Sequence, residues 1–304
     1  MYKVLVAFDI DRRAVEYMER NGISVEVRSD ITQEEFDNVY HKYDAVVVRG
    51  NIKVRPSRGR GELDVIVRAG VGLDNIDLKG FSELGVEVLN TPEASTNSVA
   101  ELTICLMICL ARRLLPASSS LKQGKWMKAG VMGEELRGKT LGVVGCGRIG
   151  RAVSRLGSCL GMKVLVYDVV NVDEDFLRSI GARQVELREL LSQSDFVTVH
   201  VPLEESTRHL LGEEELRMMK RSAYLINVAR GGVVDEGALK RALMEGRIAG
   251  AALDVFEREP PDDLELLSLP NLLPTPHIGA QTQDAQTIAG LRAAELVVSS
   301  LIKV

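Results

Sequence analysis

The chain has 304 residues, of which 45% are hydrophobic and 27% charged, with a formal net charge of −5. This length is enough for two domains of ordinary size. The negative charge repels polyanions, so we expect no nucleic-acid partner. The N-terminal apolar run is interrupted by Asp9, and the longest apolar stretch, Leu102 to Ala111, is about half of a membrane span. We therefore expect a cytoplasmic protein without a membrane segment.

The cysteines form no recognisable metal or disulfide pattern. They are Cys105, Cys109, Cys146 and Cys159, with no C-x-x-C spacing and no paired histidines nearby. Cys105 and Cys109 lie one helical turn apart in an apolar segment, where buried structural thiols are expected. We predict no metal site.

Short β-branched runs alternate with amphipathic segments through the first 90 residues. The runs are KVLVAF (3–8), SVEV (24–27), DAVVVR (44–49), DVIVRAG (64–70) and VEVLN (86–90). Such alternation is typical of an α/β fold with a mainly parallel sheet. Asn90-Thr91-Pro92 then stops the pattern, and Ser95 or Thr96 can cap a long helix through residues 100–115. We place a domain boundary here.

The alternation restarts after Gly133. The new runs are TLGVVG (140–145), KVLVYD (163–168), DFVTVH (195–200), AYLINVA (223–229) and AGAALDV (249–255). They predict a second doubly wound parallel sheet. The final segment, 281–304, has the apolar spacing of a helix that leaves this second domain.

A glycine motif indicates a nucleotide site. Gly145, Gly147 and Gly150 follow an apolar strand and open a helix near Arg148, where free N–H groups and the helix dipole favour a pyrophosphate. Asp168 ends the next strand, where its carboxylate can accept both hydroxyls of an adenine ribose. No arginine follows Asp168 to offset a 2′-phosphate, so NAD is predicted over NADP.

Three polar residues come at the ends of apolar strands in the second half: Arg230, Glu259 and His277. A carbonyl that accepts a hydride needs a cation nearby and a proton donor that works near neutral pH. A glutamate bonded to an imidazole would orient the ring and favour its protonated form. Each residue alone also fits a structural role, as a surface ion-pair partner, a turn residue or a satisfied structural histidine.

Longer motifs surround these three residues and extend over most of the chain. They are RAGVGLDNIDL (68–78), residues 89–112, residues 124–150, VHVPL (199–203), INVARGGVVDE (226–236), AALDVFEREP (251–260) and TPHIGAQT (275–282). Through them the chain resembles the D-isomer-specific 2-hydroxyacid dehydrogenases, and within these most closely the D-3-phosphoglycerate dehydrogenases.

The resemblance implies a domain organisation. A Rossmann NAD-binding domain, residues 93–280, is inserted into a smaller, flavodoxin-like substrate domain, residues 1–92, which the helix at 281–304 completes. The resemblance further implies a homodimer through the NAD-binding domain, with Trp126 and the helix at 96–114 in the interface.

The resemblance also implies roles for single residues. Arg230 binds the substrate carboxylate and polarises the 2-oxo group, His277 is the proton donor, and Glu259 pairs with His277. The substrate is further held by Arg49, Val71 and Gly72. The implied NAD contacts are Val71, Gly145, Gly147, Arg148, Ile149, Gly150, Asp168, His200, Val201, Pro202, Thr207, Val228, Ala229, Arg230, Asp254, His277, Gly279 and Ala280.

Two features differ from the family pattern. The sequence ends at Val304, whereas many phosphoglycerate dehydrogenases continue into a regulatory module, so we expect no feedback through such a module. The loop RGNIKVRPSRGR (49–60) replaces a stretch containing serine and threonine, which leaves the tail of the substrate open. The hypotheses are oxidation of D-3-phosphoglycerate, reduction of glyoxylate or hydroxypyruvate, and NAD(H) sensing without turnover.

Overall fold

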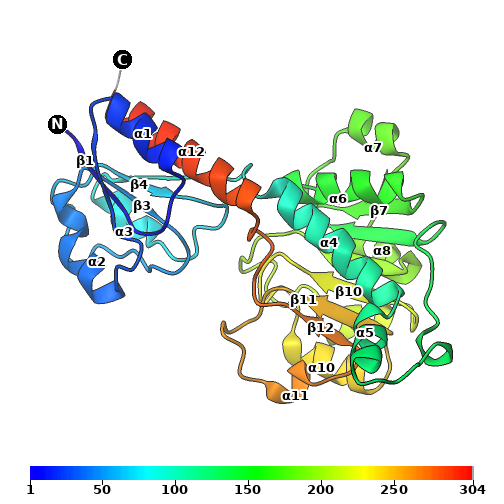
Figure 1. Ribbon diagram of the computed structural model, residues 1–304. Helices are drawn as coiled ribbons and strands as arrows, with labels where there is room; N and C mark the ends of the chain where they lie inside the picture. The colour runs from blue at the N-terminus through cyan, green and yellow to red at the C-terminus, as the bar shows by residue number, and fades with distance from the viewer. Residues whose placement is uncertain (303–304) are drawn as a thin grey trace. The chain divides into compact units, whose positions relative to one another are not determined.

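The computed structural model describes residues 1–302 and divides into two compact units. Unit 1 consists of Met1–Thr96 together with the chain from Ala280 onwards, and unit 2 of Asn97–Gly279. Each unit contains one parallel sheet with helices on both faces (Figure 1). The predicted α/β class with two doubly wound parallel sheets is thus confirmed. The last two residues of the helix predicted at 281–304 lie outside the described residues.

The sheet of unit 1 has five strands in the order β2-β1-β3-β4-β5. Its strands are β1 (Lys3–Val6), β2 (Ser24–Val27), β3 (Ala45–Val48), β4 (Val65–Arg68) and β5 (Glu87–Asn90). Its helices are α1 (Arg12–Arg20), α2 (Gln33–Val39), the short η1 (Tyr40–Lys42), α3 (Leu78–Glu83) and α12 (Gln283–Leu301). Alternate strand residues face two separate cores, one beneath α1 and α12 and one beneath α2 and α3.

Helix α12 packs closely against the rest of unit 1 because its inner face is made of small residues. Thr282 caps its first turn by accepting the N–H of Ala285. Ala293 and Ala294 are fully buried in the core beneath α1 and α12. A Cβ on Gly290 would lie 2.9 Å from the side chain of Ile10, so this position requires glycine for close packing.

The sheet of unit 2 has seven strands in the order β12-β11-β10-β9-β6-β7-β8. The strands are β6 (Thr140–Val144), β7 (Lys163–Tyr167), β8 (Arg183–Gln184), β9 (Phe196–Val199), β10 (Tyr224–Asn227), β11 (Gly250–Leu253) and β12 (Leu272–Pro274). Its helices are α4 (Thr96–Ala111), α5 (Leu114–Lys122), η2 (Ala129–Val131), α6 (Arg148–Cys159), α7 (Glu174–Ile180), α8 (Leu187–Gln193), α9 (Glu213–Met218), α10 (Glu236–Met244) and α11 (Leu264–Leu267). The strand order reverses between β6 and β9, the usual place for a ligand in such sheets.

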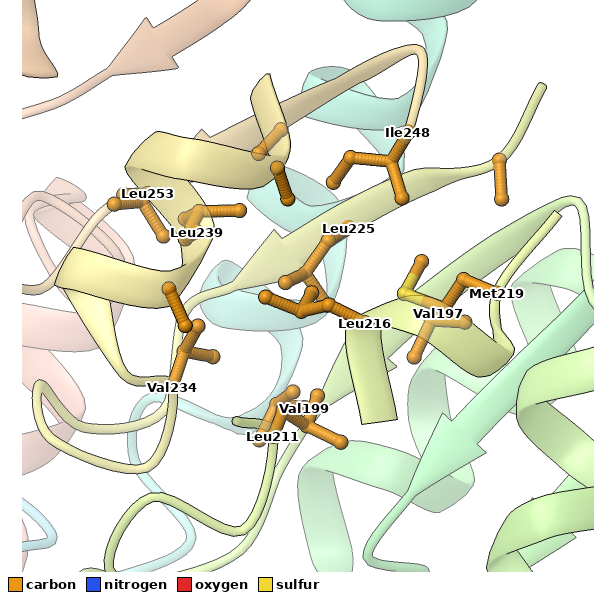
Figure 2. Packing of buried hydrophobic residues seen from close by; sticks show 14 of the residues in the cluster. Val197, Val199, Leu211, Leu216, Met219, Leu225, Val234, Leu239, Ile248 and Leu253 are labelled. Carbon is orange, nitrogen blue, oxygen red and sulfur yellow. The ribbon is translucent and has the colours of Figure 1, made fainter. Parts of the chain in front are cut away.

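Figure 2 shows the core on one face of this sheet. Val199 of β9 and Leu225 of β10 pack against Leu216 of α9 and Leu239 of α10, and all four are essentially inaccessible to solvent. The other face is covered by α4, α6 and α7, whose apolar side chains form a second core. The sheet is therefore buried on both faces, and its functional groups lie at the strand ends.

The long helix predicted through residues 100–115 is interrupted. Helix α4 ends at Ala111, and Arg113 has a left-handed backbone with φ of 48° before α5 begins at Leu114. A left-handed residue cannot continue a helix, and the apolar pattern alone does not reveal it. Of the two residues predicted as the cap, Ser95 directly precedes α4, whereas Thr96 is already inside the helix and its buried hydroxyl makes no hydrogen bond within residues 1–302.

The burial predicted for the cysteine pair in α4 is not observed. Cys105 is exposed and Cys109 is only partly buried. Leu106, Met107 and Ala111 face the core instead. The helix is apolar on all sides, so its sequence does not indicate which face is covered. Within residues 1–302, no helix combines the length and apolar character needed to cross a membrane.

Candidate active site at the carboxyl edge of the seven-stranded sheet

The three glycines after β6 serve different purposes. Gly145 has φ of 92°, and a Cβ there would lie 2.7 Å from the Val201 side chain. A Cβ on Gly150 would lie 2.0 Å from the Gly145 carbonyl oxygen, so α6 can approach the turn only with glycine at that position. A Cβ on Gly147 would meet nothing within 4 Å. The space beside Gly147, at the N-terminus of α6, is where a pyrophosphate fits.

Asp168 lies directly after β7, beside the glycine turn. Its Oδ2 accepts the N–H of Cys146 at 2.7 Å, and its Oδ1 accepts the N–H of Val170 at 3.2 Å. A carboxylate offers about four acceptor positions, so these two bonds leave capacity for ribose hydroxyls. Val169 and Val170 are exposed and uncharged, which leaves the carboxylate unopposed where a 2′-phosphate would enter.

Cys146 lies in the same turn and remains a neutral thiol. Burial raises the pKa of Cys146 to about 11. The turn therefore presents backbone N–H groups and the Asp168 carboxylate, which suit the pyrophosphate and ribose of NAD. When bound, NAD would supply a hydride acceptor.

The segment after β9 packs against the glycine turn. The His200 Nε2 lies 3.0 Å from the Thr198 hydroxyl, and its buried Nδ1 makes no hydrogen bond to any described residue. Burial lowers the pKa of His200 to about 3, so the ring is neutral near pH 7. The Thr207 hydroxyl donates to the Pro202 carbonyl at 2.6 Å. The His200 Nε2 and the Thr207 hydroxyl thus have partners within the protein, and the His200 carbonyl lies beside Gly145 of the glycine turn.

Arg230 occupies a tight turn after β10. The buried Asn227 side chain accepts the N–H of Ala229 at 3.0 Å and donates to the carbonyl of Arg230 at 2.9 Å. The guanidinium Nη1 donates to the Ala229 carbonyl at 2.7 Å. Val228 is buried under this turn. The guanidinium is consequently oriented by its own loop, which reduces the entropy lost when it binds an anion.

Asp254, after β11, organises the loop that carries His277. Its side chain is almost fully buried and accepts the Thr275 hydroxyl at 2.6 Å, the N–H of Ile278 at 2.8 Å and the N–H of Gly279 at 2.8 Å. Its carbonyl accepts the N–H of His277 at 2.9 Å. These bonds hold His277 with φ of 53°, a left-handed conformation that an isolated residue rarely adopts.

Glu259 and His277 form a hydrogen-bonded pair. The His277 Nδ1 lies 2.8 Å from the Glu259 Oε2, and the Glu259 Oε1 accepts the N–H of Phe256 at 3.2 Å. Both side chains are partly exposed, at 50% for His277 and 40% for Glu259. Because Nδ1 is engaged with the carboxylate, Nε2 is the nitrogen left for proton exchange. This arrangement suits a general acid and base.

The residues predicted in unit 1 follow β3 and β4. The Arg49 guanidinium lies over the Phe8 ring, 4.3 Å from its centroid, and the buried Nε has no hydrogen-bond partner among the described residues. Burial lowers the pKa of Arg49, an effect that Asp9 opposes. Arg49 helps to line a surface pocket with Asp9, Ile10, Asp11, Gln281, Thr282, Gln283, Gln286 and Thr287. The unused Nε donor of Arg49 is available to an anion, while Asp9 and Asp11 place two carboxylates in the same pocket.

The other predicted contacts of unit 1 are backbone groups. The Val71 carbonyl accepts the Asn90 amide at 2.5 Å, and Val71 and Gly72 are partly buried. The Ala280 carbonyl accepts the Gln286 amide at 3.0 Å. Each of these segments is thereby anchored within unit 1.

One cluster in unit 2 was missed in the sequence. His209, Asp235, Glu236 and Glu257 converge near the turn that carries Glu259. Asp235, Glu236 and Glu257 lie in two of the quoted motifs, but His209 lies in none and is 48 positions from Glu257, so the sequence did not indicate that they meet. Across residues 1–302, no three or more His, Cys, Asp or Glu side chains are arranged to hold a metal ion.

Known proteins give independent information on this site. The family model "D-isomer specific 2-hydroxyacid dehydrogenase, NAD binding domain" matches residues 104–279. A D-3-phosphoglycerate dehydrogenase of Methanocaldococcus jannaschii is 45% identical over 98% of this chain, which spans 57% of the length of that relative. A hydroxypyruvate reductase of Thermotoga maritima is 42% identical over 99% of this chain and 98% of its own. The crystal structure of a glyoxylate reductase from Paecilomyes thermophila is 31% identical, with a TM-score of 0.90 over 99% of this chain and 96% of its own.

These matches confirm two predictions. The resemblance inferred from the motifs is confirmed by relatives that match nearly the whole chain. NAD as the cofactor is confirmed by the family model, whose match includes the glycine turn, Asp168 and the Glu259–His277 pair. The chain therefore belongs to the family of D-isomer specific 2-hydroxyacid dehydrogenases.

Proposed function

We propose that the protein interconverts a D-2-hydroxy acid and its 2-oxo acid with NAD, and that its substrate is D-3-phosphoglycerate, oxidised to 3-phosphooxypyruvate. The observation that carries the chemistry is the 2.8 Å contact between the His277 Nδ1 and the Glu259 Oε2, in the same unit as Arg230 and the glycine turn. The phosphoglycerate dehydrogenases among the relatives support the choice of substrate.

In the direction of oxidation, the Nε2 of neutral His277 accepts the proton of the substrate 2-hydroxyl. Glu259 stabilises the imidazolium that forms, because its carboxylate already accepts a hydrogen bond from Nδ1. Arg230 binds the substrate carboxylate and attracts the developing 2-oxo group. In reduction, the imidazolium returns the proton to the same oxygen.

Two further substrate groups, the carboxylate and the phosphate, are assigned to residues of unit 1. We propose that the N–H groups of Val71 and Gly72 hold the substrate carboxylate and that Arg49 binds the phosphate. The unpaired Nε of Arg49 supports this role, since a planar guanidinium is well suited to a phosphate.

Hydroxypyruvate or glyoxylate reduction is the second candidate. It is favoured by the relative from Thermotoga maritima, a hydroxypyruvate reductase that matches this chain over almost its entire length. The two candidates share Arg230, Glu259 and His277, and they differ in whether the substrate carries a phosphate.

The test is a panel of 2-hydroxy and 2-oxo acids, with and without a 3-phosphate, assayed by NADH absorbance. In this panel Arg49→Ala should lower kcat/KM for 3-phosphooxypyruvate by about ten- to a hundredfold and leave hydroxypyruvate almost unchanged. An equal loss with both substrates would remove Arg49 as the phosphate ligand. NADH binding without turnover of any acid would favour a sensor.

We also propose a homodimer through unit 2. The proposal is supported by a set of exposed apolar side chains on α5 and the segment after it. Covering these side chains with a second copy of the chain would remove them from water, which is favourable. They are Leu114, Leu115, Leu121, Trp126, Met127 and Met132. Light scattering should give twice the monomer mass, and Trp126→Asp should reduce it.

A further inference from the structure

We infer that His209 is a positioning residue for the acid and base pair: through Glu257 it holds the turn that presents Glu259 to His277. The inference rests on the proposed function, in which Glu259 and His277 carry the proton. Residues 256–259 are called the glutamate turn below.

His209 reaches the glutamate turn from the loop after β9. Its Nε2 lies 3.1 Å from the Glu257 Oε1, and its Nδ1 lies 3.9 Å from an Asp235 carboxylate oxygen. Its own N–H donates to the Gly232 carbonyl at 2.7 Å. The backbone has φ of 52°, in the left-handed region, which directs the ring to this turn.

Glu257 is bound on its other side by the start of α10. The Glu257 N–H donates to the Glu236 Oε1 at 2.5 Å, and the Glu236 N–H donates to the Glu257 Oε1 at 3.3 Å. Burial, with the nearby Glu257 charge, raises the pKa of Glu236. The same Oε1 of Glu257 therefore accepts from α10 and contacts His209, and this end of the glutamate turn is held from two elements.

The opposite end of the glutamate turn holds Glu259. The Phe256 N–H donates to the Glu259 Oε1, whose partner Oε2 contacts His277. A Cβ on Gly231 would lie 1.8 Å from the Phe256 carbonyl oxygen, so the loop that carries Arg230 also packs directly on this turn. Glu257 directly follows Phe256, whose N–H binds the Glu259 side chain, and is separated from Glu259 by one residue, so a shift of Glu257 should change how Glu259 is presented.

A simple stabilising role accounts less well for these contacts. The side chains of His209 and Glu257 are 36% and 34% exposed, and exposed ion pairs contribute little to stability. A left-handed conformation, by contrast, costs free energy at a residue other than glycine. The left-handed conformation of His209 is therefore better explained by its contact with the glutamate turn than by a gain in stability.

The experiment is an NMR titration of the histidine rings in the full chain without substrate. The chain has four histidines, and His200 does not titrate near neutral pH because burial lowers its pKa to about 3. The His277 midpoint should move to lower pH in His209→Ala by roughly half a pH unit, since Glu259 is then less well aligned. His209→Gln places an amide nitrogen near the position of Nε2 and should retain the midpoint. Arg217→Ala, which removes an exposed ion pair on α9, is the matched control.

A double variant separates positioning from stability. In Glu259→Gln, adding His209→Ala should leave the His277 midpoint unchanged, because the group that His209 positions no longer carries a charge. The inference is overturned if His209→Ala shifts the melting temperature but not the midpoint, or if its shift persists in the Glu259→Gln background. If His209→Ala does not fold, Glu257→Ala, which removes the acceptor shared by His209 and the Glu236 N–H, should produce the same downward shift, and an unmoved midpoint there also overturns the inference. The readout needs no turnover, so its failure is distinguishable from failure of the proposed function.

Discussion

The two sides of the carboxyl edge of the seven-stranded sheet are built differently. Beside β6 and β7, the groups available to a ligand are backbone N–H groups of the glycine turn and one carboxylate, Asp168, anchored by two N–H donors. Beside β10 to β12, they are the partly exposed side chains of Arg230, Glu259 and His277. The first side depends on packing that admits only glycine, whereas the second depends on hydrogen bonds that orient side chains. Binding and proton transfer should therefore be separable by mutation.

The two histidines of this edge make the same point. His200 follows β9, between the two sides, and its burial keeps it neutral. His277 follows β12, is half exposed and contacts a carboxylate. The residue type is the same, but only His277 has both a partner for its imidazolium and a nitrogen open to a substrate.

The largest expected effect separates chemistry from binding. His277→Gln should lower kcat by about 10²- to 10⁴-fold, because the proton then has no side chain to accept it. The affinity for NADH should fall far less than kcat, because His277 is only one of many implied cofactor contacts, and quenching of the fluorescence of Trp126 measures it. A kcat close to that of the unmodified protein would exclude His277 as the acid and base.

The converse change is Asp168→Ala on the other side of the edge. It should weaken NAD binding by about ten- to a hundredfold, since hydrogen bonds to a charged group are lost, and it should affect NADP less. Saturating NAD should restore kcat almost fully. Calorimetric titration with both cofactors measures the difference in affinity between NAD and NADP. Equal binding of the two by the unmodified protein would contradict the role of Asp168.

A third prediction concerns His200 and stability. Unfolding exposes a ring with the ordinary pKa of 6.5, whereas burial lowers the folded pKa to about 3. Between these values the unfolded state binds more protons, so stability falls as the pH decreases from 6.5 towards 3. From pH 7 to pH 5 this costs about 2 kcal/mol. His200→Gln, compared by urea unfolding at both pH values, should lack that part of the loss; equal losses would mean that His200 is not held neutral.

The smallest effect is expected for Glu259→Gln, which retains the shape of the pair but removes the charge. The imidazolium is then less favoured. Oxidation needs neutral imidazole, so the low-pH limb of its kcat/KM profile should move to lower pH. Reduction needs imidazolium, so the high-pH limb of its profile should also move to lower pH. The expected movement is about one pH unit. Profiles of kcat/KM in both directions measure it, and limbs that stay in place would show that the pair is not coupled.

Much of this protein could be predicted from its sequence. Apart from the two-residue β8, which no predicted run covers, the strands, the parallel sheets and the glycine motif with Asp168 follow from local patterns, because apolar periodicity and glycine spacing reflect short stretches of backbone. The resemblance to the dehydrogenase family also rests on contiguous motifs. These features are local, since each is contained in a short run of consecutive residues.

Only the tertiary structure decided which distant groups meet. Asp254 bonds to the loop of His277 more than 20 residues away, and His209 contacts Glu257 across 48 residues. The left-handed backbone of Arg113 and the exposure of Cys105 were likewise not predictable. The physical reason is that periodicity specifies which side chains are apolar, whereas the pairing of polar groups and the choice of covered helix face depend on how whole elements pack against one another.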